Sequence, residues 1–531
     1  ISLFLLLQTI HFFINKKRIK ETWFVTLITS PFLFYTLSLT YTDNLTEGLK
    51  NLERITFLFL GPLVLYLNRS FINLNTFKLA LNVFSVSSIL LVLYSIVSLI
   101  YSGINPLSSD YFTLRTALEQ FSRMHPTYFS MTISIAFLYL LSTLFLEEKV
   151  TSKAVKISGL FIISTGLLVA SSKMILAGTV LSSIYIVFKN LPKGNAALLT
   201  LLGSVILAVV IYSSDPLRIR ITEFYRAISN ESIEQNNPDS MRKVIFEGTV
   251  YTIKQQPFLG AGIGSQQELI DNYYLKQKQT LAFNKHFNAH NQYLQTWITA
   301  GIMSFILLIL ILITLITIGI ILNNSLLASV GILFALSMFS ESILTRQDGV
   351  FLFAFFPSFL VYAVWNKQIA TTFINGRFIT QPLTGVQRYA QEICKYLQTN
   401  TNFRLIAPKN RNNQLSFIKG NFWEQVILPI RLKLIGSPLL LNLCNTAPII
   451  YKNHITVIHD VAFLKNPNWF NSGFRTWYKF MLKFTVRNAK KLITVSNFSK
   501  KELVYFTGCR PDKIEITFNG VSDDFLTQKK T

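Results

Sequence analysis

Residues 292–321 read QYLQTWITAGIMSFILLILILITLITIGII, a stretch without a single charged side chain. A helix needs roughly 20 apolar residues to cross the hydrocarbon core of a bilayer, so this stretch is long enough to span a membrane. Half of the 531 residues in the chain are hydrophobic and 14% are charged. Soluble domains carry about 25% charged residues. The composition therefore predicts that most of the chain meets lipid rather than water.

Similar apolar runs recur along residues 1–365. They predict a polytopic, all-α membrane domain of about eleven spans. The candidate spans lie near residues 1–14, 23–41, 52–67, 79–101, 126–146, 157–171, 174–188, 196–213, 292–321, 325–341 and 349–365.

Lysine and arginine are distributed unevenly between the loops that alternate along these spans. One side carries the basic loops, at residues 16–20, 69–78, 149–156 and 189–195. Basic loops stay on the cytoplasmic side of a membrane. The alternation then places residues 102–125, the long loop 214–291 and the turn 342–348 outside, and residues 366–531 in the cytoplasm. We expect a multi-pass protein of a bacterial inner membrane with a cytoplasmic C-terminal segment.

The C-terminal part of the chain is strongly basic. Residues 366–531 contain 24 Lys and Arg against 8 Asp and Glu, a net charge of +16, whereas the first 365 residues have 26 against 18, a net charge of +8. Attraction to anionic membrane lipids and phosphate-bearing substrates accounts for this charge. No nucleic-acid-binding signature accompanies it, so we expect no nucleic acid partner. Cys394, Cys444 and Cys509 lack metal-ligand spacing, as is typical of a reducing compartment.

Polar residues that could bind a substrate or take part in a reaction lie in and near the long loop. Residues 239–265 read DSMRKVIFEGTVYTIKQQPFLGAGIGS, residues 290–301 read HNQYLQTWITAG, and residues 123–128 read RMHPTY at the start of another span. Arginine binds phosphate oxygens through a bidentate fork, and histidine titrates nearest to neutral pH. These side chains suit the binding of a diphosphate and the removal of a proton from a hydroxyl group.

The order of these motifs resembles the O-antigen ligase and polymerase family of bacterial envelope enzymes. The resemblance rests on a loop arginine (Arg242), a Pro-x-x-Gly-x-Gly segment, and His290-Asn291 followed ten residues later by Gly301, and RMHPTY resembles a second outer-face motif. It covers about residues 1–365. It implies an enzyme that takes a glycan from a polyprenyl-diphosphate-linked donor and passes it to a lipid or glycan acceptor.

On this resemblance we assign catalytic roles to His290, Arg242 and Arg123, and substrate-binding roles to Arg115 and Asn291. Arginine would stabilise the leaving diphosphate, and His290 would act as general base toward the acceptor hydroxyl. Arg115 could take the place of Arg123. The outer loops contain no Asp-x-Asp pair or histidine cluster with ligand spacing, so we expect no metal or other cofactor. The simpler alternatives are that His290 caps a helix or binds a lipid headgroup, and that Arg242 binds lipid phosphate.

Gly260, Gly262 and Gly264 resemble a dinucleotide-binding fingerprint only superficially, because no strand and helix flank them. We expect a turn that lets the loop backbone fold tightly.

From Thr372 onward, short strand-like runs alternate with helical patterns. This alternation predicts a parallel α/β layer, a Rossmann-like half-domain over residues 372–531. The strand-like runs read TTFINGRF, FRLIAP, LLLNL, HITVIHDV and KLITVS.

Five ordered motifs in this segment resemble the N-terminal half of family 4 retaining glycosyltransferases of the GT-B type. They are Asn375-Gly376-Arg377, PLTGVQRY at 382–389, VIHD at 457–460, TVSNFS at 494–499 and Asn519-Gly520-Val521. The resemblance implies that Gly385 approaches a substrate phosphate and that His459 faces the transferred sugar, and we add Asn519 and Gly520 to the substrate-binding residues. The simpler alternative is that Gly385 starts a helix and His459 ends a buried strand.

The sequence stops at Thr531, where the second Rossmann-like domain of a GT-B enzyme is expected. We expect this half to be inactive alone, and the chain to be either a fragment or a natural fusion.

The leading interpretation is a membrane glycan transferase that carries a partial glycosyltransferase domain. Ligase, polymerase and protein glycosylation all fit it. One alternative is a transporter or flippase for lipid-linked glycans, which predicts ionisable residues or broken helices within the spans. Another is a membrane-anchored family 4 glycosyltransferase, for which eleven spans exceed what an anchor needs. The scarcity of charges in the spans favours the enzyme.

Overall fold

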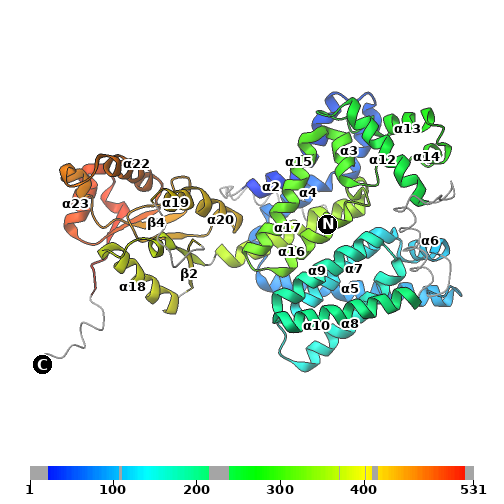
Figure 1. The fold of residues 1–531 in the computed structure, drawn as a ribbon, viewed down its shortest axis with the longest axis horizontal. Helices are drawn as coiled ribbons and strands as arrows, with labels where there is room; N and C mark the ends of the chain where they lie inside the picture. The colour runs from blue at the N-terminus through cyan, green and yellow to red at the C-terminus, as the bar shows by residue number, and fades with distance from the viewer. Residues whose placement is uncertain are drawn as a thin grey trace. The chain divides into compact units, whose positions relative to one another are not determined.

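The computed structural model describes residues 22–106, 111–213, 238–369, 371–400, 402–408 and 417–520. The chain divides into two compact units, Ile1–Val364 and Trp365–Thr531. The described part of the first unit is helical, and the second unit contains a parallel sheet flanked by helices (Figure 1).

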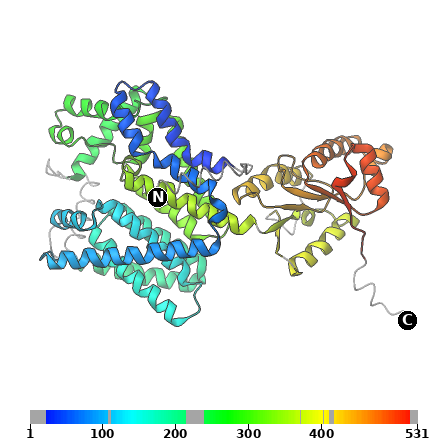
Figure 2. The same cartoon turned by 180° about the vertical axis from the view of Figure 1, so that it is seen from behind.

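The described part of the first unit runs from α2 to α17. The bounds of its α-helices are α2 (Trp23–Leu37), α3 (Leu45–Arg54), α4 (Phe57–Leu67), α5 (Leu74–Tyr101), α6 (Tyr111–Ser122), α7 (Pro126–Leu144), α8 (Val150–Ala170), α9 (Lys173–Asn190), α10 (Lys193–Ser213), α12 (Pro238–Gln255), α13 (Gln266–Lys276), α14 (Thr280–Asn284), α15 (Gln292–Ile321), α16 (Ser325–Ser337) and α17 (Gln347–Ile369). In both views α6 and the group α12–α14 lie at the same end of this unit (Figures 1 and 2).

Six helical segments of the described residues are long and apolar enough to cross a membrane: Trp23–Thr40, Leu74–Tyr101, Pro126–Leu144, Val150–Ala170, Gln292–Ile321 and Gln347–Gln368. The predicted count of about eleven spans is therefore not confirmed.

The other predicted spans differ from these six segments in length, in charge or in whether the structure describes them. The predicted span 52–67 contains the end of α3 and the 11-residue helix α4, which is about 16 Å long and too short for a bilayer core of about 30 Å. Ser325–Ser337 is apolar but short, and within the longer helix α10 the apolar segment is Lys193–Ile206. The predicted span 174–188 falls within α9, which begins at Lys173 and has Lys189 in its last turn. The predicted span 1–14 lies outside the described residues.

The glycine-rich loop before α13 folds as tightly as predicted. Gly260 and Gly262 adopt φ angles of +74° and +83°, a region that glycine enters without the steric cost of a side chain. The backbone N–H group of Gly262 donates to the carbonyl oxygen of Thr299 at 3.0 Å. The turn thus pairs with the backbone of α15.

Helix α15 is interrupted where this loop meets it. Ala300 and Gly301 have non-helical backbone angles, with φ of +76° at Gly301. The carbonyl oxygen of Ile298, which lies just before the break, accepts a hydrogen bond from the N–H group of Ala261 at 2.7 Å. A side chain at Gly301 would collide with the carbonyl oxygen of Phe258. The glycine ten residues beyond Asn291 is therefore required for close packing between the loop and the helix.

The second unit has a six-stranded, fully parallel sheet, which confirms the predicted α/β layer. Its strands are β1 (Thr372–Asn375), β2 (Phe403–Ile406), β3 (Leu440–Asn442), β4 (His454–Val457), β5 (Lys491–Thr494) and β6 (Ile514–Ile516), in the order β2-β1-β3-β4-β5-β6. The chain runs from β1 to β2 in one direction and continues from β3 in the other. The strand order therefore reverses between β1 and β3.

Helices cover both faces of this sheet. Helix α18 (Gly385–Asn400) lies on one face, and α22 (Ser472–Asn488) and α23 (Asn497–Thr507) lie on the other (Figures 1 and 2). The remaining helices are α19 (Phe417–Phe422), a π-helical turn (Trp423–Ile427), α20 (Leu428–Leu434) and α21 (Ala462–Lys465).

Candidate functional site

His290 lies immediately before α15, next to a carboxylate. Its Nδ1 atom is 3.7 Å from Oε1 of Glu341, and the side chains of His290 and Glu341 are 37% and 19% exposed. The backbone of His290 has a φ of +41°, and its N–H group donates to Oδ1 of Asn288 at 3.0 Å. Such a φ angle is unfavourable for residues other than glycine and persists where the surroundings fix it. The imidazole is thus held beside an acid while part of it remains open to solvent.

The residue after the His-Asn pair fixes the segment that carries Glu341. Gln292 is fully buried, and its backbone N–H group donates to the carbonyl oxygen of Met338 at 2.8 Å. Its Oε1 atom accepts a hydrogen bond from the N–H group of Leu344 at 2.6 Å. These two bonds bracket Glu341 on both sides.

Asn291, which we expected to bind substrate, makes two structural contacts. Its Oδ1 atom accepts a hydrogen bond from the N–H group of Leu294 at 3.1 Å and so caps α15. Its Nδ2 atom donates to the carbonyl oxygen of Phe339 at 3.2 Å. The His-Asn-Gln sequence therefore positions the histidine and the Glu341 segment relative to each other.

A second pair of side chains joins α6 to the start of α7. Nη2 of Arg115 lies 2.6 Å from Nε2 of His125, which is the N-cap residue of α7. A guanidinium group only donates hydrogen bonds, so Nε2 of His125 must accept and cannot carry a proton. Burial, together with the positive charges of Arg115 and Arg346, lowers the pKa of His125 to about 4. His125 is therefore neutral near pH 7.

The two pairs belong to one electrostatic site. The charges of Glu341, Arg346 and His290 all act on the pKa of His125. Burial would raise the pKa of Glu341, but contact with His290 and the nearby positive charges outweigh it, so this pKa lies below its usual range. We call the group formed by Arg115, His125, His290, Glu341 and Arg346 the His290 cluster. It combines a partly exposed base with two guanidinium groups.

The other predicted arginines lie on exposed surface. Arg123 is exposed, with a φ of +54°, two residues before His125. The structure thus brings Arg115, rather than Arg123, into contact with His125. Arg242 is exposed on α12, whose residues Met241 and Ile245 share a hydrophobic cluster with Ile298 of α15.

Sequence reasoning missed Glu341 and Arg346, and quoted His125 without assigning it a role. Both missed residues lie in the connection between α16 and α17. Glu341 ends the predicted span 325–341, and Arg346 lies in the predicted outer turn 342–348. A signal was available for Glu341, because an ionisable residue within a predicted span is costly and often functional.

In the second unit, polar residues gather where β1 and β3 end. Ligands of open parallel sheets bind beyond the carboxyl ends of the strands, at the point where the strand order reverses. Asn375 ends β1, Asn442 ends β3, and Nδ2 of Asn375 donates to Oδ1 of Asn442 at 2.9 Å. The predicted Asn-Gly-Arg motif therefore lies at the expected position for a site.

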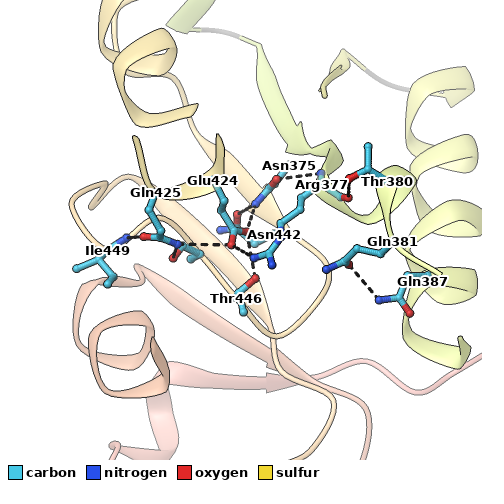
Figure 3. Close-up of polar contacts among 11 residues, drawn as sticks. Asn375, Arg377, Thr380, Gln381, Gln387, Glu424, Gln425, Asn442, Thr446 and Ile449 are labelled. Carbon is cyan, nitrogen blue, oxygen red and sulfur yellow. Dashed lines mark hydrogen bonds and ion pairs between the residues drawn. The ribbon is translucent and has the colours of Figure 1, made fainter. Parts of the chain in front are cut away.

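Glu424, in the π-helical turn, lies at the centre of this group (Figure 3). Its carboxylate pairs with Arg377 and accepts hydrogen bonds from Nδ2 of Asn375 at 2.8 Å and from Oγ1 of Thr446 at 3.0 Å. The side chains of Arg377 and Glu424 are 7% and 1% exposed. The carboxylate and the guanidinium group thus form an ion pair inside the unit.

The four predicted substrate-binding residues of this unit occupy different environments. Gly385 starts α18 in an exposed position, with open space where a Cβ atom would lie. His459 follows β4 and is buried, and its Nε2 atom lies 3.1 Å from the carbonyl oxygen of Leu443. Burial lowers the pKa of His459. Asn519 and Gly520 are exposed beyond β6, three strands removed from β1.

Comparison with protein families divides the chain in the same way. Residues 158–309 match a family model described as O-antigen ligase, and residues 436–525 match one described as Glycosyltransferase Family 4. The chain joins an O-antigen ligase-like region to a family 4 glycosyltransferase-like region. Neither match covers half of the chain, and no curated protein matches it significantly.

These matches confirm both resemblances. The first contains Arg242, His290 and Asn291, and the second contains His459, Asn519 and Gly520. Together with the apolar helices, they support a membrane protein with a glycan-modifying function of the glycosyltransferase type.

Proposed function

We propose that the chain transfers a glycan from a polyprenyl-diphosphate-linked donor to an acceptor hydroxyl at the His290 cluster. The observation that carries this proposal is the pairing of the partly exposed His290 with Glu341 within reach of the charge of Arg346. The O-antigen ligase match includes His290 and supports the reaction class.

The proposed chemistry uses His290 as the base. It takes the proton of the acceptor hydroxyl as that oxygen attacks the anomeric carbon of the donor. The bond between the anomeric carbon and the phosphate oxygen breaks, and its electron pair leaves with the diphosphate. Arg115 and Arg346 stabilise the developing negative charge, while Glu341 stabilises the imidazolium ion.

Arg242 and Arg123 take a different role in this proposal. Both are exposed, so they suit capture of the donor diphosphate at the membrane surface more than contact with the reacting carbon. Arg242→Ala should abolish transfer at limiting donor concentration. Arg242→Lys should recover little, because an ammonium group cannot reproduce a bidentate guanidinium contact.

In this proposal the protein lies in the bacterial inner membrane, with the His290 cluster outside and the second unit in the cytoplasm. The distribution of basic loops supports this orientation.

His290→Ala tests the proposal in a transfer assay with the purified chain and a short-chain polyprenyl-diphosphate glycan. Loss of the base should lower the rate by about 10²–10⁴-fold. The matched control is His286→Ala, because His286 pairs with Asp271 at 2.7 Å and its side chain is 63% exposed. His286 lies in the same loop but outside the cluster. Equal rates for the two alanine variants would refute the proposal.

Two observations favour a further substrate site in the second unit. Its family match and the reversal of strand order between β1 and β3 favour a substrate near Gly385 and His459, with Asn519 and Gly520 at a separate contact. Calorimetric titration of the whole protein with nucleotide-sugars tests this, since His459→Ala should weaken binding and His290→Ala should not.

A further inference from the structure

Helix α22 of the second unit has one face buried and one face exposed. Met481, Leu482, Thr485 and Val486 are buried against the unit. Leu482 and Val486 share a hydrophobic cluster with Leu492 of β5. The opposite face of the helix includes the exposed residues Phe480, Lys483 and Arg487.

Four basic residues follow one another along this helix, of which Arg475 is half-buried and the other three are exposed. Arg475, Lys479, Lys483 and Arg487 are spaced four residues apart, which places them in one row on a helix. In the part of the chain that the structure describes, none of the four forms an ion pair. The surrounding segment 461–501 contains nine Lys and Arg residues and no Asp or Glu.

Aromatic residues run beside this basic row. The ring centroids of Trp477 and Phe480 are 6.1 Å apart, and those of Phe480 and Phe484 are 4.9 Å apart. Phe480 is 49% exposed, and Trp469, just before the helix, is 75% exposed. Large aromatic groups are costly to leave in water and are favoured at the interface between lipid and water.

We propose that this basic-aromatic face of α22 docks onto the surface of an anionic lipid bilayer. A helix with a cationic face and exposed aromatic rings has the composition of an interfacial helix. The chain itself keeps the second unit near lipid, because the candidate span Gln347–Gln368 ends only a few residues before β1 begins at Thr372. Each basic residue near an anionic leaflet favours docking by roughly fivefold, so four favour it by several hundred-fold. This proposal is independent of the glycan-transfer chemistry.

The test uses the full chain in nanodiscs with a spin label at Thr476→Cys, an exposed position between Arg475 and Lys479. Unsubstituted protein serves as the blank for labelling of the native cysteines. In phosphatidylcholine mixed with phosphatidylglycerol, the label should become less mobile and more accessible to oxygen than to a water-soluble nickel complex. In phosphatidylcholine alone it should stay mobile. Salt near 1 M, where the Debye length is about 3 Å, should reverse the effect.

Two charge-matched variants test whether the α22 face causes the response to anionic lipid. R475Q/K479Q/K483Q/R487Q should lose the response to anionic lipid. R388Q/K395Q/R404Q/K452Q removes the same charge from exposed positions elsewhere in the unit and should keep it. An equal response in both nanodiscs, equal loss in both variants, or immobilisation by an added oligonucleotide regardless of lipid would overturn the proposal. The lipid and salt comparisons use the labelled chain without these charge substitutions, so they hold even if one variant misfolds.

Discussion

The His290 cluster and the buried group around Glu424 (Asn375, Arg377 and Thr446) use the same types of charged side chain in opposite ways. In the first, His290 and Glu341 have 37% and 19% exposed side chains and a separation of 3.7 Å. In the second, Arg377 and Glu424 have 7% and 1% exposed side chains and are in direct contact. A loosely paired and partly exposed base can meet a substrate. A buried pair in direct contact instead holds its own unit together.

This contrast affects how the Asn-Gly-Arg motif of the second unit is interpreted. Asn375-Gly376-Arg377 resembles part of a glycosyltransferase signature, yet the side chain of Arg377 is directed to Glu424 inside the unit (Figure 3). The reason lies in electrostatics, because a buried guanidinium group without a partner would be strongly unfavourable. We therefore interpret the Arg377–Glu424 pair as structural.

The largest expected effect is on stability, from Glu424→Ala. Removing the carboxylate leaves Arg377 buried without a counter-charge, which should destabilise the second unit by about 3–5 kcal/mol. Urea unfolding followed by limited proteolysis measures this. Glycan transfer by folded protein should be unchanged, and His290→Ala provides the reverse control, with lost transfer and unchanged unfolding. A catalytic role for Glu424 would instead appear as lost transfer without lost stability.

The fold could be predicted where the local sequence pattern determines the secondary structure. The apolar run 292–321 is helical apart from a break at Ala300 and Gly301, and the strand-like runs form a parallel sheet. The number of spans could not be predicted, because hydropathy alone does not separate the 11-residue helix α4 from a full crossing.

The candidate site was predicted less completely than the fold. His290 was assigned from its motif, whereas Glu341 approaches it only because Gln292 bonds to both ends of the intervening segment. Likewise, the choice of Arg115 over Arg123 depends on the packing of α6 against α7. Such contacts between distant segments leave no local pattern in the sequence.

A smaller effect is expected from Glu341→Gln. Glutamine keeps the size of the side chain but cannot stabilise a protonated imidazole, so transfer should fall by about 10–100-fold. The measurement is single-turnover transfer at saturating donor. In a His290→Ala background the same change should have little further effect, because the two residues act as a unit. Additive losses in the double variant would show that Glu341 acts without His290.

The smallest expected effect is a pH dependence of stability that comes from His125 and differs in pH range from that of Glu341. The folded protein holds His125 with a pKa of about 4, below its usual 6.5, because burial and nearby arginines disfavour the imidazolium. Between these two values the unfolded chain binds a proton that the folded chain does not. Stability must therefore rise with pH from about 4 to about 6.5. Partial exposure to solvent limits the contribution to about 1–2 kcal/mol.

His125→Asn should remove that slope while keeping a residue that caps helices well. Glu341 also favours the folded state at higher pH, but its pKa lies below the usual carboxyl range, so its contribution is lost only as the pH falls below about 4.3. Between pH 5 and pH 7 Glu341 stays ionised, whereas burial also lowers the pKa of His454 and His459. The difference in melting temperature between detergent-solubilised wild type and His125→Asn over this range therefore reports on His125. The wild type should lose stability relative to His125→Asn as the pH falls through this range, and Glu341→Gln should follow the wild-type slope. Parallel curves for wild type and His125→Asn would mean that Arg115 does not hold the imidazole in its neutral form.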